Sequence, residues 1–187
     1  MPTLQFVRHG ETEWNRAGLI QGSSDIPLSE RGHAQARELA AQLAMRPISA
    51  LYTSDLRRAV ETVAPLATRL LLEIETTPAL RERDFGTNEG RLSAEVAAER
   101  GTERGTAWAG IDERHPGGES IRELYERVSR FLDAVLERAA DGEIVLVTSG
   151  GPICVAAAHL AREPVESVAW RAFDNCSITT VEVSAPE

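Results

Sequence analysis

Two short stretches of this sequence carry residues suited to holding and transferring a phosphate group. The first is Arg8-His9-Gly10, which follows a short apolar run and so leaves the end of an expected strand. An arginine can donate two parallel hydrogen bonds to phosphate oxygens, a histidine serves as a base or a nucleophile, and a glycine lets the backbone approach a ligand closely. The pattern indicates a phosphate site at the end of this strand.

The second stretch is a strand that runs into a glycine-rich turn. After the apolar residues 144–148 come Ser149, Gly150, Gly151 and Pro152, at the start of an expected helix. Backbone N–H groups at a helix start point toward an anion, and proline is tolerated in the first turn. The turn predicts a second anion-holding segment, with a neutral serine where a charged group would be expected.

Two further charged residues follow expected strands. Arg58 lies near the start of the helix after residues 48–53, and Glu82 lies beyond the next apolar run. In a parallel sheet, ligands sit at the carboxyl ends of the strands. We therefore expect Arg8, Arg58, Glu82 and Ser149 to share one edge.

Hydrophobic periodicity and turn residues predict strands that alternate with helices. The expected strands are Leu4–Val7, Ile48–Thr53, Leu72–Glu75, 143–148 and a last one near 176–183. The expected helices are Ser29 to Met45 with Ser29 as N-cap, one capped by Ser54 or Asp55 and kinked or split at Pro65, Ser93 to about Arg100, Ser120 to about Ala140 with a capping box, and 152–161.

This alternation predicts an α/β fold, a three-layer α/β/α sandwich with a mostly parallel central sheet. The 187 residues suit a single domain over 1–187. Most of the loop signals fall in 101–118. We expect a lid or insert segment at about 91–118, with Trp108 in the part that governs specificity.

Composition excludes several classes of partner. The formal net charge of −9 argues against nucleic acid or an anionic membrane, and every basic residue is an arginine. No cysteine, histidine or carboxylate spacing indicates a metal or other cofactor. The two cysteines are unpatterned, and neither a signal peptide nor a membrane-length apolar run is found, so we expect a cytoplasmic protein. A homodimer is left open.

The motifs, taken in order, resemble those of the histidine phosphatase superfamily, the phosphoglycerate mutase-like enzymes. The resemblance covers nearly the whole chain, and "GSSDIPLS" favours the phosphatase branch. The segments that carry it are "RHGET" (8–12), "GLIQGSSDIPLSERGHAQA" (18–36), "LYTSDLRRAVET" (51–62), "LRERDFGTNEG" (80–90), "PGGES" (116–120), "VLVTSGG" (145–151) and "DNCSITTVEV" (174–183).

The resemblance implies a role for each matched residue. His9 matches the nucleophile that takes the phosphoryl group, and Arg8 and Arg58 match the two arginines that clamp the phosphate. Glu82 matches the acid that protonates the leaving oxygen. Asn15 and Gln21 match positions that touch phosphate or substrate, although hydrogen bonding within their own turns is an alternative for both.

Two positions depart from the family pattern. Where the family usually has a second histidine, this chain has Ser149, which offers one hydrogen bond beside the amides of Gly150 and Gly151; the loss of such a donor typically costs about 10²–10³ in rate. Asn88 replaces an aromatic residue, which predicts a changed pocket rim. His115 is expected on the surface, with a place facing the pocket as the alternative.

We therefore expect a phosphatase that hydrolyses small phosphomonoesters through a phosphohistidine, at a reduced rate because of Ser149. One alternative is a catalytically weak protein that binds phosphate ligands, but such a binder would not need an acid such as Glu82. A phosphoglycerate mutase is a further alternative, and it would require the phosphohistidine to survive until the product binds again.

Overall fold

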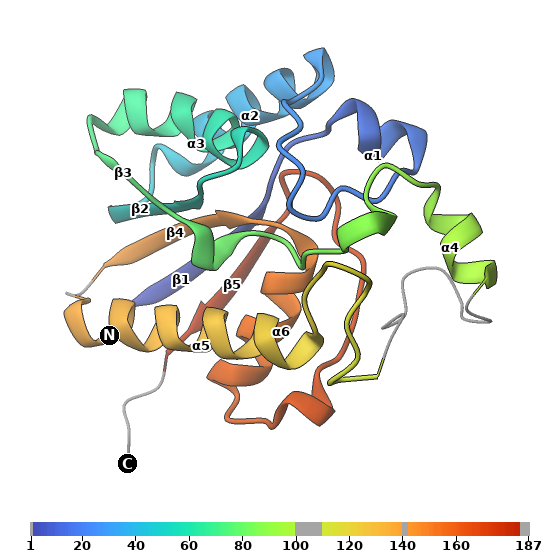
Figure 1. The fold of residues 1–187 in the computed structure, drawn as a ribbon. Helices are drawn as coiled ribbons and strands as arrows, with labels where there is room; N and C mark the ends of the chain where they lie inside the picture. Colours follow the sequence, from blue (N-terminus) through green and yellow to red (C-terminus); the bar gives the residue numbers. More distant parts are fainter. Residues whose placement is uncertain (1, 100–109, 140–141, 184–187) are drawn as a thin grey trace.

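A five-stranded sheet organises the computed structural model, which describes residues 2–99, 110–139 and 142–183. The strand order is β3-β2-β4-β1-β5 (Figure 1). The strands are β1 (Thr3–Arg8), β2 (Ile48–Ser54), β3 (Ile74–Thr77), β4 (Glu143–Thr148) and β5 (Ile178–Glu182). Only β5 pairs antiparallel, with β1, so the sheet is mostly parallel as predicted.

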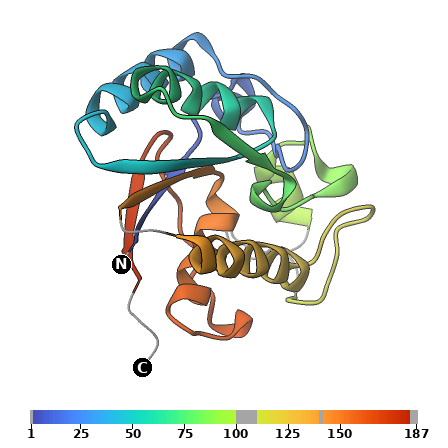
Figure 2. The ribbon, with the colours of Figure 1, turned by 90° about the vertical axis from the view of Figure 1, so that its left-hand side faces the viewer.

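Helices cover the sheet on both faces, which confirms the three-layer α/β fold. Figures 1 and 2 show α2 and α3 over one face and α5 and α6 over the other. The helices of the described residues are α1 (Glu13–Ala17), α2 (Glu30–Leu43), α3 (Arg57–Leu70), α4 (Ser93–Glu99), α5 (Ile121–Arg138) and α6 (Gly150–Leu160).

The side chains of β4 show how the two layers are held. Ile144 and Leu146 are buried in the cluster formed with α5 and α6, whereas Val145 and Val147 are buried in the cluster formed with α2 and α3. Successive side chains of a strand point to opposite faces, so an unbroken apolar run is what a doubly covered strand requires.

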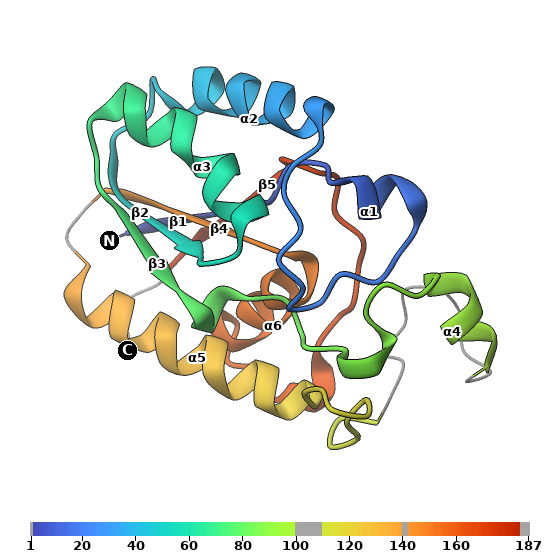
Figure 3. The ribbon, with the colours of Figure 1, turned by 45° about the horizontal axis from the view of Figure 1, so that its top comes forward.

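The strand register brings the predicted site residues to one edge. Arg8, the last residue of β1, pairs with Thr148, the last residue of β4, so His9 and Ser149 leave the sheet side by side. The short helices α1 and α4 lie beyond this edge (Figures 1 and 3). The segment that follows β3 passes the same edge, because the Thr148 hydroxyl donates to the Leu80 carbonyl oxygen at 2.6 Å.

The N-terminus of α3 is not capped as predicted. Its N-cap residue is Leu56 instead of Ser54 or Asp55, and Leu56 makes no side-chain cap bond. The Arg57 N–H donates instead to the Asp25 carboxylate at 2.7 Å. Asp25, which lies 32 residues earlier, therefore caps the helix in place of the adjacent residues that the sequence indicated.

The prediction for Pro65 was that it kinks or splits α3. The split was wrong, because the helix runs from Arg57 to Leu70 with Pro65 inside it. A proline in a helix interior costs about 3 kcal/mol. The opposite face of α3 buries Ala59, Val63 and Leu66 against the sheet and α2. Burial of a Val or Leu side chain contributes about 1.5–3 kcal/mol, which is enough to offset the proline.

The short helix α1 was not predicted, whereas the remaining predicted elements agree with the structure within a few residues. Ser120 and Glu123 form the predicted capping box of α5. The third strand begins two residues later than expected, and α6 begins two residues earlier, at Gly150. Among the described residues, no helix combines the length and apolar character needed to cross a membrane.

Candidate active site

A cavity of about 280 Å³ lies where β1 and β4 end. It is lined by all eight residues that the sequence assigned to the site: Arg8, His9, Asn15, Gln21, Arg58, Glu82, Ser149 and Gly150. They lie at the ends of four different strands, β1 to β4, or in the loops and helix starts that follow them. The fold thus brings together residues that lie up to 142 positions apart in the chain.

His9 is the reactive group that the backbone controls most closely. Its side chain is 3 % exposed, and its Nδ1 lies 2.7 Å from the Gly10 carbonyl oxygen. Because a carbonyl only accepts, Nδ1 carries the proton, and Nε2 keeps a free lone pair. Burial lowers the pKa of His9 well below 6.5, and the charges of Arg58 and Arg8 lower it further. His9 is therefore a neutral imidazole held in one tautomer.

The turn after His9 depends on a residue without a side chain. A Cβ on Gly10 would lie 2.9 Å from the Gly32 carbonyl oxygen. The Gly10 N–H donates to the Thr62 hydroxyl of α3 at 2.9 Å. The close approach of α2 and this hydrogen bond together fix the backbone carbonyl that holds the imidazole.

Arg58 is directed into the cavity by backbone carbonyl groups. It is 1 % exposed, and its Nη1 and Nη2 donate to the carbonyl oxygens of Ser24 and Gly22 at 2.7 and 2.6 Å. Arg8 likewise donates to the Phe173 carbonyl oxygen. Burial lowers the pKa of both guanidinium groups.

These two arginines make no close ion pair, and Glu82 attracts both charges only from further away. Among the residues that the structure describes, no carboxylate lies within ion-pair distance of Arg8 or Arg58. A carbonyl oxygen orients a guanidinium group without neutralising it, so both keep their full charge and further N–H donors. The cavity can therefore accept a doubly charged phosphate group.

Glu82 stands at the N-terminus of α6. Its carboxylate accepts the N–H of Gly151 at 3.1 Å and that of Arg83 at 2.8 Å. A Cβ on Gly151 would lie 2.2 Å from the Glu82 Oε1 atom, so this contact requires glycine. The second glycine of the turn is thus explained by the position of the carboxylate.

Ser149 leaves the start of α6 open. It is the N-cap residue, yet its hydroxyl makes no cap hydrogen bond, and the side chain is 5 % exposed within the cavity lining. An N-cap serine normally satisfies one of the free helical N–H groups. Here the hydroxyl and the Gly150 N–H both remain available to an anion.

Asn15 and Gln21 form hydrogen bonds with neighbouring loop residues and also line the cavity, so their predicted contact with phosphate stays a prediction. Asn15 forms a capping box with Thr12 at the start of α1, and the Gln21 Oε1 atom lies 3.0 Å from the Thr12 hydroxyl. Both residues also line the cavity. Turn hydrogen bonding holds their side chains at the wall, where their amide groups can meet a ligand.

Sequence reasoning missed a cationic residue at the cavity. Arg171 lines it, and its guanidinium lies over the ring of Phe173 at 4.8 Å from the centroid. The signal was an arginine between Trp170 and Phe173, shortly before the last strand. The other lining residues that the sequence did not single out are Leu19, Ile20, Gly22, Phe85, Ser93, Ala172 and Phe173.

Two predictions about the surroundings were wrong. His115 is neither on the surface nor at the cavity: it is fully buried, with its ring against the edge of Phe85. Its Nδ1 lies 2.8 Å from the Asn88 amide nitrogen. Asn88 is buried as well and is absent from the cavity lining, so it supports the wall from behind and forms no rim.

Part of the expected lid cannot be placed, because residues 100–109, with Trp108, lie outside the described part of the chain. Ser93, near the start of the expected lid at 91–118, lines the cavity. Within the described residues, no group of three or more His, Cys, Asp or Glu side chains is arranged to hold a metal ion.

Comparison with known proteins gives a match over nearly the whole chain. The family model of the histidine phosphatase superfamily (branch 1) matches residues 4–186. A 2,3-bisphosphoglycerate-dependent phosphoglycerate mutase 2 from Gloeobacter violaceus is 35% identical, and the match covers 90% of this chain and 81% of that protein. A probable phosphoglycerate mutase GpmB from Cronobacter sakazakii is 34% identical, over 97% and 85% of the two chains.

Solved structures of phosphatases share the fold. A mycobacterial glucosyl-3-phosphoglycerate phosphatase in complex with VO3 superposes with a TM-score of 0.87 at 29% identity, over 96% of this chain and 92% of that one. A phosphoserine phosphatase variant from Entamoeba histolytica in complex with phosphoserine gives 0.77 at 28% identity, over 96% and 90%.

Proposed function

Because the chain belongs to the histidine phosphatase superfamily, we propose that it hydrolyses small phosphomonoesters through a phosphohistidine at His9. One observation carries the proposal above all. A neutral imidazole, with its Nδ1 proton donated to Gly10, lies beside two arginines that no carboxylate within ion-pair distance neutralises in the described structure. This is the arrangement that a nucleophile toward a phosphate dianion requires.

In the first step, Nε2 of His9 attacks the phosphorus and the ester P–O bond breaks. Protonated Glu82 gives its proton to the departing oxygen, so the product leaves as an alcohol. Arg8 and Arg58 balance the charge on the three equatorial oxygens as they pass through the transition state. In the second step water attacks the phosphohistidine, Glu82 accepts a proton, and free phosphate leaves with His9 neutral again.

Ser149 sets the rate in this proposal. Its hydroxyl and the Gly150 N–H would donate to the phosphate, but neither carries a full positive charge. The absence of one preorganised charged donor typically lowers the rate by about 10²–10³. We therefore propose a slow phosphatase.

The remainder of the substrate would lie on the side of Arg171. This guanidinium is exposed and stacks on Phe173, so it is available to an anionic group beyond the phosphate. The similar phosphatases are named for glucosyl-3-phosphoglycerate and phosphoserine, and both of these molecules contain a carboxylate. Within the proposed single domain, segment 91–118 would then cover this side as a lid.

A phosphoglycerate mutase is the second candidate, because curated relatives at 34–35% identity carry that name. A mutase must shield its phosphohistidine from water until the product binds again. The two reactions are separated by the fate of the phosphate: a mutase returns it to a hydroxyl of the acceptor, whereas a phosphatase releases it to water.

The test is turnover of p-nitrophenyl phosphate across pH 5–8 by the wild type and by His9→Ala. We expect slow release of phosphate by the wild type and none by the variant. If neither turns over while inorganic phosphate still binds, the chain is a phosphate-binding protein. Ser149→His would then show whether that one position silenced the chemistry.

A further inference from the structure

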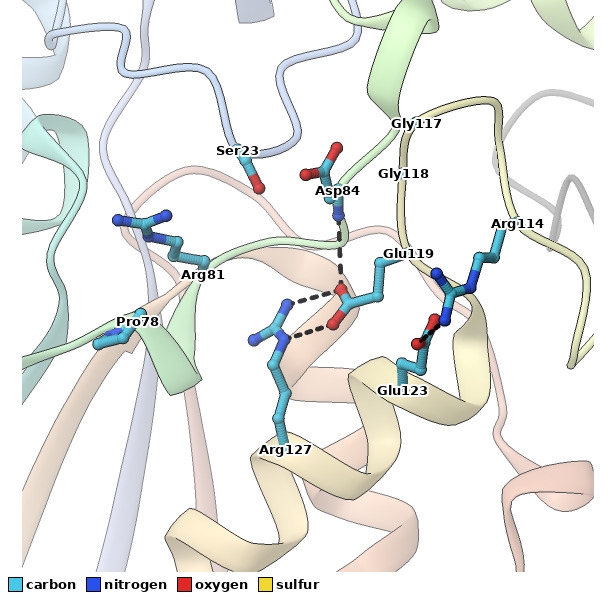
Figure 4. A pocket seen from close by; sticks show the side chains of 10 residues that line it. All are labelled: Ser23, Pro78, Arg81, Asp84, Arg114, Gly117, Gly118, Glu119, Glu123 and Arg127. Carbon is cyan, nitrogen blue, oxygen red and sulfur yellow. Dashed lines mark hydrogen bonds and ion pairs between the residues drawn. The ribbon is translucent and has the colours of Figure 1, made fainter.

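A second pocket, of about 310 Å³, lies behind the segment that carries Glu82 (Figure 4). The residues that line it include Arg81, Asp84, Arg114, Gly118, Glu119 and Arg127. We propose that two of them, Arg127 and Glu119, are positioning residues that hold Glu82 in place for proton transfer. The inference rests on the proposed function, since it concerns the acid of that reaction.

Arg127 ties the Glu82 segment to α5. Its Nη2 donates to the carbonyl oxygen of Glu82 itself at 3.0 Å, and its Nη1 donates to that of Ala79 at 2.7 Å. One guanidinium thus holds the backbone at both ends of residues 79–82. The rigid helix α5 supplies the anchor, because Arg127 stands in its second turn.

Glu119 fixes the guanidinium of Arg127. Its two carboxylate oxygens accept from Nε and Nη2 of Arg127 at 2.7 and 2.9 Å, as Figure 4 shows. Such a two-point pair sets direction as well as distance. The side chains are only 22% and 16% exposed, so water competes weakly for this pair.

Glu119 also holds the residues that follow Glu82. Its backbone N–H donates to the Asp84 carbonyl oxygen at 2.9 Å, and its backbone carbonyl oxygen accepts from the Arg83 Nε at 2.9 Å. Contacts on both sides of Glu82 therefore converge on one residue of the loop before α5.

Gly118 of the "PGGES" motif and Gly86 of the facing segment make this approach possible. A Cβ on Gly118 would lie 2.5 Å from the Asp84 carbonyl oxygen. Gly86 has a φ of +54°, and a Cβ there would lie 2.1 Å from the Pro116 carbonyl oxygen. The motif thus lets loop 116–120 lie directly against segment 84–86, and so accounts for residues that the catalytic steps leave unused.

The result is that Glu82 is held from two directions. Its carboxylate reaches the Gly151 N–H at the start of α6, and its backbone is fixed from α5. The other cations of the second pocket are paired with carboxylates too, Arg81 with Asp55 and Arg114 with Glu123. These pairings favour a supporting role for the pocket over the binding of an anion.

The test uses two substrates that differ in their need for an acid. The p-nitrophenolate ion leaves unprotonated, whereas the alkoxide of an alkyl phosphate such as β-glycerophosphate must be protonated as it leaves. For Arg127→Ala we expect kcat/KM to fall about 30–100-fold on β-glycerophosphate and less than about 3-fold on p-nitrophenyl phosphate. We compare kcat/KM because it reports the steps up to departure of the leaving group, whereas kcat also contains hydrolysis of the phosphohistidine, which both substrates share.

Controls separate positioning from loss of structure. Arg130→Ala removes an exposed arginine of the same helix and should leave kcat/KM unchanged on both substrates. Glu119→Gln keeps the size of the side chain and should show the same substrate dependence at a smaller magnitude, and Arg127→Lys should restore part of the loss. These two variants carry the test if Arg127→Ala does not fold.

A variant without the acid gives the sharpest outcome. In a Glu82→Gln background, Arg127→Ala should have almost no further effect on β-glycerophosphate hydrolysis, because there is no proton left to position. Equal losses on both substrates, or the same loss with and without Glu82, would overturn the inference. A wild type inactive on both substrates would instead overturn the proposed function, and the inference with it.

Discussion

The two pockets beside the Glu82 segment use arginine in opposite ways. In the cavity around His9, the guanidinium groups of Arg8 and Arg58 donate to backbone carbonyl oxygens. In the second pocket, Arg81, Arg114 and Arg127 each pair with a carboxylate. Segment 78–85 contributes side chains to both pockets, so the difference arises over a few residues.

The partners of the arginines distinguish a pocket that can bind an anion from a pocket that supports the protein structure. A carbonyl oxygen holds a guanidinium group in place and leaves its charge for a ligand, whereas a carboxylate cancels the charge. A buried charge without a close ion-pair partner costs free energy, and burial accordingly lowers the pKa of Arg8 and Arg58 although Glu82 raises both. A chain with a net charge of −9 can thus keep one positive cavity.

The largest effect that would test this comparison is expected at Arg58. Arg58→Met keeps the volume and removes the charge, so kcat/KM for p-nitrophenyl phosphate should fall about 10³-fold, and inorganic phosphate should no longer inhibit. Steady-state kinetics with phosphate as inhibitor measures both.

Arg114→Met is the matched control, because Arg114 lines the second pocket and already forms an ion pair with Glu123. It should change kcat/KM less than about 3-fold. Similar losses in the two variants would break the distinction between paired and unpaired arginines.

A smaller effect is expected at the glycines of the turn before α6. Gly151→Ala places a Cβ against the Glu82 carboxylate and should lower kcat for an alkyl phosphate about 10–100-fold. Gly150→Ala would meet only the Phe173 ring, at 3.6 Å, and should cost much less. Kinetics of the two variants side by side measure the contrast, and a reversed order would exclude the proposed place of Glu82.

The smallest effect is one of pH on stability, and its sign follows from His9. The native pKa of His9 is lowered, so as the pH falls through 6.5 the unfolded chain binds a proton that the native chain does not. The wild type should therefore lose stability below pH 6.5 relative to His9→Asn, by on the order of 1–2 kcal/mol at pH 5.

Urea unfolding of both proteins at pH 8 and pH 5 measures this difference. A gap between the two free energies of unfolding that stays constant over this range would show that His9 takes up its proton in the native state as well. Burial and the charges of Arg58 and Arg8 would then fail to explain the neutral state of His9.

Much of the fold could be predicted because its signals are local. The apolar run of β4 and the capping box at Ser120 and Glu123 are each contained in a few residues, and both are found where the sequence indicates. Motifs at strand ends likewise brought Arg8, His9 and Ser149 to one edge, since parallel strands end together.

The predictions that failed concern contacts between segments that are distant in the sequence. The cap of α3 comes from Asp25, and His115 is buried because it meets Asn88, which lies 27 positions away. The hydrogen bond from Arg127 to the Glu82 backbone spans 45 positions. No periodicity or capping pattern reports such pairs, so the supporting side of the site could be found only in the structure.

The most direct test of the account is to trap the phosphorylated enzyme. The wild type and His9→Ala are mixed with a phosphomonoester that carries labelled phosphate, quenched within milliseconds in alkali, and mapped by peptide mass spectrometry. The account predicts an acid-labile phosphoryl group on His9 of the wild type and none on the variant. Turnover by the wild type with no label on His9, or equal turnover by His9→Ala, would contradict it.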